Sequence, residues 1–215
     1  MFINQLKEIM KKAFVYSFIA ILTTSCAALR KPAPTPAFVQ ASKFHERVAI
    51  LPFTVEFDEN YKRNMAMQGG RNVRTQDYWL KTGKFAGMDM QTNAFKNMAR
   101  RISKGSYELV IQDFLTTNRK LDELGISYQG LPAVNKSLLA KQLEVDAVIY
   151  GETLVDIDFR GINPGGVNSR ISVYDARSGE IIWQDELEQQ IGSMQDSPER
   201  LASRTIEQLI KRLPY

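Results

Sequence analysis

The chain has 215 residues, of which 28 are Lys or Arg and 24 are Asp or Glu, and its formal net charge is +4. Because this excess is small and no long run of Lys or Arg occurs, we exclude a nucleic-acid-binding protein. A single cysteine, Cys26, excludes an internal disulfide. The only histidine, His45, lies at the edge of the predicted linker. With one cysteine and one histidine the chain has too few ligands for a Cys/His zinc site, and from the same count we exclude His-based catalytic triads.

The N-terminal residues have the layout of an export signal. Two lysines precede the apolar run AFVYSFIAIL at 13–22, and TTSC follows at 23–26. This run is about half of the roughly 20 residues that cross a bilayer as a helix, so we predict a removed signal peptide over residues 1–25. Its end resembles a bacterial lipobox, which implies a lipid with acyl chains such as palmitate on Cys26, although Thr23 stands where leucine is usual. The alternative is an uncleaved anchor in which Cys26 is a small buried side chain.

A proline-rich segment follows the cysteine. Three prolines occur at alternate positions from residue 32, so we predict that residues 26–46 form an extended tether. About 20 residues reach roughly 25 Å as a flexible coil and roughly 60 Å as polyproline helix. The two alanines after the cysteine lack the acids that signal retention or surface display, so we expect anchoring in the outer membrane, facing the periplasm. Residues 47–215 then form one periplasmic domain.

The first half of this domain alternates strands and helices. The apolar run RVAILPF at 47–53 predicts a buried strand that Pro52 ends. Thr92 is a plausible cap for a helix whose apolar residues recur at helical spacing as far as Gly105. The remaining elements of this half are a strand at 107–112, a helix capped by Thr116 or Thr117 and running to 124, and a helix after Pro132.

Three strands and a helix complete the domain. They are predicted at 146–159, 168–175, 180–189 and 198–213. The first strand alternates apolar and polar residues in its second half, which is typical of a strand with one buried face. Because two short turns join the three strands, they are antiparallel. The sequence therefore predicts an α/β fold in the order βαβααβββα, with a mixed sheet of about five strands and helices packed on it.

Residues 56–91 do not fit this rhythm and are predicted to be a long insertion. A stretch of this length between a strand and a helix is usually functional or disordered. It contains Arg71, Arg74, Tyr78 and Trp79, residue types that dominate protein interfaces, and we select these four as candidates for partner binding. The alternative is that the aromatic residues cover the domain's own core.

No residue pattern indicates catalysis or a cofactor. Glu152, Asp156 and Asp158 share a predicted strand face and invite a cation site, but a solvated outer face explains them better, because no turn supplies further ligands. The acids at 185–188 resemble a glycosidase pair in residue type alone. The glycine clusters lack phosphate-binding spacing. We therefore predict no catalytic residue, no metal and no cofactor.

Three phrases resemble a known group of bacterial lipoproteins. VAILPF at 48–53, VDAVIYGE at 145–152 and ISVYDARSGEIIW at 171–183 resemble the periplasmic domains of the curli-secretion lipoprotein (CsgG) superfamily. The last phrase, with its continuation QDELE, is similar to the lipoprotein activator of penicillin-binding proteins, LpoB. The resemblance implies the fold more than a function. The turn at 160–167 is too short for the membrane-spanning hairpin of a secretion pore.

These observations predict a non-enzymatic, membrane-anchored lipoprotein. Its periplasmic domain is expected to bind and to regulate or scaffold an envelope partner protein, as the resemblance to a penicillin-binding-protein activator implies. A first alternative is a structural subunit of an oligomeric envelope secretion or transport complex, which makes a homo-oligomer an open prediction. A second alternative is a metal-binding or small-ligand-binding protein that uses the acidic strand faces.

Overall fold

The computed structural model describes residues 32–68, 74–105, 108–157, 165–191 and 197–215. The chain divides into two compact units, 1–33 and 34–215, and the second is described below. Cys26, Arg71 and Asp158 lie outside the described residues, so the structure does not bear on the predictions made for them. Within the described ranges, no helix combines the length and apolar character needed to span a bilayer.

A mixed sheet of six strands forms the centre of the unit. Its strands are β1 (Arg47–Ile50), β2 (Thr54–Phe57), β3 (Val110–Ile111), β4 (Ala147–Ile157), β5 (Gly165–Asp175) and β6 (Ile181–Gln190). The order across the sheet is β3-β1-β4-β5-β6, and β2 also pairs with β4. Strands β1 and β2 lie parallel to successive halves of β4, whereas β4, β5 and β6 are antiparallel. The predicted α/β class and the antiparallel C-terminal strands are therefore confirmed.

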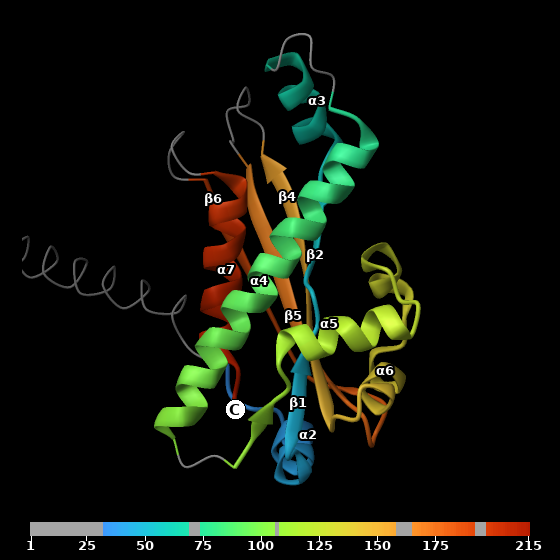
Figure 1. Ribbon diagram of the computed structural model, residues 1–215. Coiled ribbons are helices and arrows are strands. Elements are labelled where there is room, and N and C mark those ends of the chain that lie inside the picture. The colour runs from blue at the N-terminus through green and yellow to red at the C-terminus, as the bar shows by residue number, and fades with distance from the viewer. Residues whose placement is uncertain (1–31, 69–73, 106–107, 158–164, 192–196) are drawn as a thin grey trace, which may run out of the picture. The chain divides into compact units, whose positions relative to one another are not determined.

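Helices cover the two faces of the sheet unequally. They are α2 (Pro36–Ala41), the 3-10 turn η2 (Ser42–Phe44), α3 (Glu59–Gln68), α4 (Gln76–Lys104), α5 (Phe114–Glu123), the 3-10 turn η3 (Tyr128–Ala133), α6 (Lys136–Gln142) and α7 (Pro198–Arg212). The long α4 runs diagonally across the sheet with α7 beside it (Figure 1). Apolar residues of α4 and α7 share one buried cluster, while α5 and α6 contribute to a separate cluster.

The alternation along β4 shows where this second cluster ends. Ile149, Val155 and Ile157 belong to the α4 and α7 side, and Val148 and Tyr150 belong to the α5 and α6 side. Beyond Tyr150, the side chains that follow on this second face are exposed. The half of the sheet nearest the C-terminal end of β4 therefore has one face without a helix among the described residues. We call it the open sheet face.

The predicted insertion at 56–91 is part of the fold, and the element order differs from the prediction. Its described residues belong to β2, α3 and the first half of α4. Helix α4 begins after Thr75, whose hydroxyl accepts a hydrogen bond from the Tyr78 amide, rather than at Thr92. The hydroxyl of Thr92 instead donates to the Met88 carbonyl within the helix. The spacing of apolar residues did not predict the first half of α4, because this half contacts the sheet through glycines.

Two glycines allow α4 to cross the outer edge of β2. A Cβ atom on Gly87 would lie 1.9 Å from the Phe53 oxygen, and one on Gly83 would lie 2.6 Å from the Val55 oxygen. The hydroxyl of Tyr128 accepts a hydrogen bond from the Val55 amide at 2.9 Å and contacts the carbonyl oxygens of Phe53 and Gly83 at 2.8 and 2.9 Å. Among the described residues, β2 pairs with β4 alone, so no strand supplies partners for the backbone groups on its outer edge. The Tyr128 side chain supplies them instead.

The second half of the predicted tether is folded onto the domain. Residues 34–46 belong to the same compact unit as the sheet. Thr35 caps α2 and also donates from its hydroxyl to the Ile182 carbonyl at the edge strand β6. Phe38 is 3% exposed and packs edge-on against Tyr215, with ring centroids 4.9 Å apart. The extended tether predicted for 26–46 is therefore corrected: an amphipathic turn of helix replaces it from Pro36 onward, because Phe38 has an apolar site to fill.

Candidate functional site

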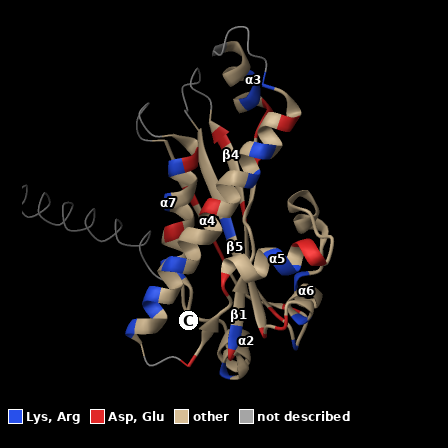
Figure 2. Ribbon diagram, in the orientation of Figure 1, with Lys and Arg blue, Asp and Glu red and all other residues tan. Residues whose placement is uncertain are grey.

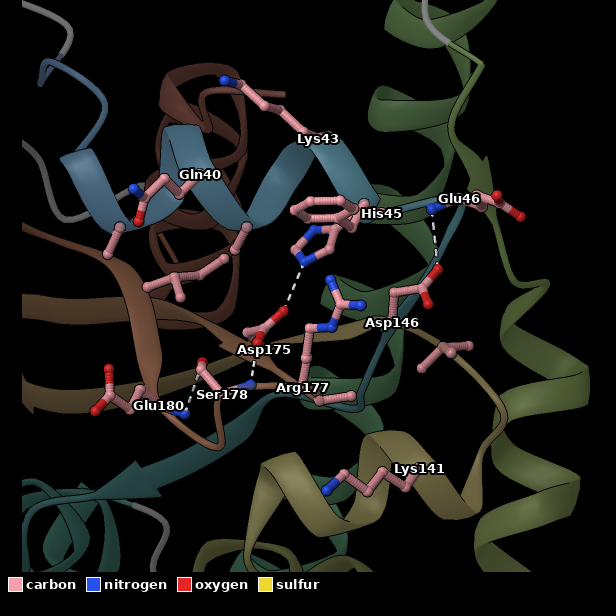
Figure 3. Close-up of a pocket in the computed structure, with 16 residues that line it drawn as sticks. Gln40, Lys43, His45, Glu46, Lys141, Asp146, Asp175, Arg177, Ser178 and Glu180 are labelled. Carbon is pink, nitrogen blue, oxygen red and sulfur yellow. Dashed lines mark hydrogen bonds and ion pairs between the residues drawn. The ribbon is translucent and has the colours of Figure 1, made fainter.

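A pocket lies where α2 and η2 meet the turn between β5 and β6 (Figure 3). It has a volume of about 1100 Å³, and α6 contributes Lys141 to its wall. His45 lies at its base and is 8% exposed. Its Nε2 is 2.8 Å from the Asp175 carboxylate, and its Nδ1 is 2.7 Å from the Tyr215 hydroxyl. His45 and Asp175, which line the pocket, therefore form with Tyr215 a buried chain of three titratable side chains from three distant segments.

This geometry corrects the exclusion of a histidine triad. One histidine is enough for such an arrangement, so counting residues did not exclude it. Burial raises the pKa of Asp175, whereas hydrogen bonds from Ser178 and His45 lower it. The hydrogen bonds together have the larger effect, so the pKa lies below the usual 3.8. Asp175 therefore remains a carboxylate over a wide pH range, and it fixes the orientation of the imidazole ring.

The third member of the chain is not an accessible nucleophile. Tyr215 is 9% exposed, and burial raises its pKa well above the usual value of 10.0. Its main-chain oxygen accepts a hydrogen bond from the Arg101 guanidinium at 2.6 Å, and Arg101 also donates to the carbonyls of Ile210 and Leu213. These contacts attach the end of α7 to α4. We therefore interpret His45, Asp175 and Tyr215 as a clamp that holds the segment before β1 against the end of the chain.

Among the residues selected for partner binding, the three that the structure describes differ in their exposure. Trp79 is 7% exposed and packs against Phe57 and Tyr61, at centroid distances of 5.1 and 5.8 Å. Its selection as a binding residue is corrected, because the ring covers the domain's own core. Tyr78, the next residue toward the N-terminus, is 41% exposed. The Arg74 guanidinium lies 5.2 and 5.5 Å from the centroids of Tyr78 and Trp79.

The exposed aromatic surface extends along α4. Phe85 lies seven residues after Tyr78, so both side chains project from one side of the helix. Phe85 is 70% exposed, the largest exposed fraction among the large apolar side chains described. Lys81 and Lys84 accompany them on the same part of α4. The sequence signal for Phe85 was present in the insertion, but a helical pattern had to be recognised there before its exposure became evident.

The open sheet face contains most of the acids considered in the sequence. Strand register places Glu56, Glu152, Asp156, Glu186 and Glu188 on it, together with Leu154, Asn168 and Arg170. Asn168 and Arg170 contact the Glu186 carboxylate at 2.7 and 3.2 Å. The Asn168 hydrogen bond lowers the pKa of Glu186, burial raises it, and Arg170 lowers it, so that the net pKa lies below its usual value. No group of three potential metal ligands occurs among the residues that the structure describes. Asp185 points to the other face and pairs with Arg212.

Comparisons with known proteins found structural matches but no sequence family. No family model matches the chain, and no curated protein matches it. The matching structures include the lipoprotein GNA1162 of Neisseria meningitidis, with 14% identity, 78% of this chain and 99% of that chain covered, and a TM-score of 0.42. The C-terminal domain of LpoB from Salmonella enterica matches with 13% identity, 67% and 82% coverage, and a TM-score of 0.33.

A further match is the PelC dodecamer of Paraburkholderia phytofirmans, with 12% identity, 79% and 89% coverage, and a TM-score of 0.41. At these values the likeness carries no argument about function. The matching structures include three of LpoB, from Salmonella enterica and Escherichia coli. They lend no support to the resemblance to the curli-secretion lipoprotein.

Proposed function

We propose that this protein is a lipid-anchored, non-catalytic binding domain of the bacterial outer membrane that contacts an envelope protein on the periplasmic side. The observation that carries the proposal is the separation of two features along α4. The clamp at His45 lies at the C-terminal end of this helix, through Tyr215 and Arg101. The exposed aromatic residues Tyr78 and Phe85 lie in its N-terminal half.

The distance between these features follows from helix geometry. From Arg101 back to Tyr78, α4 rises about 1.5 Å per residue, which amounts to roughly 35 Å. The anchored end and the aromatic surface therefore occupy opposite ends of the unit, as Figure 1 shows for α2 and the start of α4. Exposed aromatic side chains beside arginine and lysine are the residue types most often found at the centres of protein interfaces.

The clamp also limits how far a lipid on Cys26 lets the domain move. Folding of α2 leaves eight residues between Cys26 and the Thr35 cap, which is nine Cα-to-Cα steps. At about 3.4 Å per residue these span at most roughly 30 Å, half of the reach expected for the whole tether. An anchored domain thus stays close to the membrane, and its aromatic surface, at the opposite end of the unit, is available to a partner in the periplasm. A penicillin-binding protein, which the sequence resemblance implies, is the first partner to test.

Anchoring is tested by labelling cells with radioactive palmitate. The wild-type chain should incorporate label and remain with the outer membrane after fractionation. The Cys26→Ala variant should incorporate none and lose outer-membrane association. Equal labelling of both chains would refute lipidation at this residue.

Partner binding is tested with a photo-crosslinking amino acid placed at Tyr78 or Phe85 in intact cells. Both positions should yield the same crosslinked envelope protein. Leu115, a 65% exposed apolar residue on α5, is the matched control and should not yield it. If the two test positions give no product beyond that of Leu115, the aromatic surface is not a binding site.

A further inference from the structure

Opposite charges lie on opposite sides of the central sheet. Helices α4 and α7 together contain ten Lys or Arg and four Asp or Glu, which gives a net charge of +6. Figure 2 shows the basic residues recurring along α7 and the C-terminal part of α4. The open sheet face has five acids, at positions 56, 152, 156, 186 and 188, and one base, Arg170, which gives a net charge of −4.

Most of these charges have no counter-ion within the described parts of the molecule. Arg170 forms an ion pair with Glu186. The other four acids of the open sheet face, Glu56, Glu152, Asp156 and Glu188, are exposed and form no ion pair among the described residues. On the helix side, the exposed bases without a described ion pair are Lys84, Lys96, Arg100, Lys104 and Arg200.

The two charged surfaces cannot neutralise each other within one molecule, because the sheet and its buried cluster separate them. Two copies that met through the same surface would bring like charges together, which opposes a symmetric dimer at either face. Contact between the helix face of one copy and the open sheet face of another brings opposite charges together. The open sheet face also has a 290 Å³ hollow near its centre, beside the 44% exposed Leu154, which supplies an apolar contact.

We propose that a second copy of this chain docks its helix face, formed by α7 and the C-terminal half of α4, onto the open sheet face. The contact is heterologous: each copy uses one surface to bind its neighbour and leaves the other for the next copy. Such a contact builds a ring if the rotation closes and a filament if it does not. The proposal goes beyond the proposed function, since it needs neither the lipid nor an envelope partner, and the aromatic surface of Tyr78 is not part of it.

The test measures association of the purified full-length chain in mild detergent by sedimentation velocity. It uses the Cys26→Ala background, so that shared micelles do not imitate association. The wild-type sequence should associate with increasing concentration at about 50 mM salt and dissociate at about 500 mM, because exposed charges are screened over a Debye length. A chain that stays monomeric at low salt at every concentration would overturn the proposal.

Charge reversal identifies the surfaces. Asp156→Lys with Glu188→Lys brings the net charge of the open sheet face from −4 to zero, and Lys96→Glu with Arg200→Glu lowers that of α4 and α7 from +6 to +2. All four residues are exposed. Each double variant alone should associate about tenfold or more weakly, with an unchanged circular dichroism spectrum and Tm. Loss of structure in either variant is detected by these controls and is addressed by the single substitutions.

Mixing the two double variants provides the decisive measurement. The first variant has an open sheet face of net charge zero and keeps its helix face, while the second has a net charge of +2 on α4 and α7 and keeps its acidic sheet face. In the mixture, the unchanged helix face of the first variant can therefore meet the unchanged open sheet face of the second. The mixture should recover association that neither variant shows alone. Failure of the mixture to associate, or association of each variant at the wild-type level, would overturn the proposal. Because Tyr78 is unchanged in every chain, these outcomes are independent of the partner-crosslinking test.

Discussion

Replacement of Tyr128 by phenylalanine tests how the outer edge of β2 is stabilised. The substitution removes one hydroxyl and keeps the ring, so it creates almost no cavity. The Val55 amide, in a residue that is 7% exposed, loses its acceptor, which costs about 1–3 kcal/mol. The hydroxyl has one proton to share between Phe53 and Gly83, so one donated bond of about 1 kcal/mol is also lost. We expect unfolding to become easier by about 2–4 kcal/mol.

Urea denaturation followed by circular dichroism measures this loss. The midpoint should fall while the slope stays constant, because the surface exposed on unfolding does not change. Tyr78→Phe is the matched control, since this tyrosine is 41% exposed, and it should change stability by less than about 0.5 kcal/mol. A loss below about 0.5 kcal/mol in Tyr128→Phe would refute the assignment of its hydroxyl to the strand edge.

The same variant has a distinct pH dependence. Burial raises the pKa of Tyr128 from 10.0 to about 12, with the Val55 hydrogen bond lowering it and Glu56 raising it. An unfolded phenol ionises near pH 10 and the folded one only near pH 12. Stability from the neutral hydroxyl is therefore complete below pH 10 and is lost as the pH rises to 12, by at most about 2.7 kcal/mol. The stability difference between wild type and variant should shrink over this interval, and a constant difference would contradict the interpretation.

Three further changes test other parts of the fold. Gly87→Ala should destabilise the folded state by about 1–3 kcal/mol despite its better helix propensity, because the added methyl group would lie 1.9 Å from a backbone oxygen. The control is Gly130→Ala, where the added Cβ has 3.4 Å to its nearest neighbour, and it should leave the stability in the same urea assay nearly unchanged. Phe38→Ala should cost about 3–5 kcal/mol and speed proteolysis before β1, unlike replacement of the 62% exposed Phe44. The pKa of Asp175 is lower in the folded chain than the usual 3.8, so its carboxylate stabilises the fold above pH 3.8, and this stabilisation is lost as the pH falls through the folded pKa. In the Asp175→Asn variant, the urea midpoint should therefore fall less steeply at acidic pH than in the wild type.

The C-terminal strands and α7 were predictable because local patterns determine them. Ser197, Pro198 and Glu199 give a cap, a first-turn proline and a first-turn acid, and the structure begins α7 there. Alternation in β4 and two short turns specify three antiparallel strands, since a side-chain period of two and turn geometry act between near neighbours.

Contacts between distant residues decided the rest. Sequence patterns did not predict the first half of α4, which contains Gly83 and Gly87. At both glycines an added Cβ would collide with a backbone oxygen, so the helix can cross the strand edge there only without a side chain. From the sequence, His45 is assigned to the linker. In the fold, Asp175 and Tyr215 lie within hydrogen-bonding distance of its two ring nitrogens.

By itself, the sequence determined the α/β class and the C-terminal hairpins, because these depend on composition and on short-range periodicity. From the same kind of pattern it predicts an export-type N-terminus. Tertiary structure decided that Trp79 is buried while Phe85 is exposed, although both lie on one helix. It also decided which polar strand residues remain uncovered. Acids at 152 and 156 are exposed because α5 and α6 pack only over the part of the face that includes Val148 and Tyr150. Helix placement on a sheet depends on the whole chain, and no local pattern encodes it.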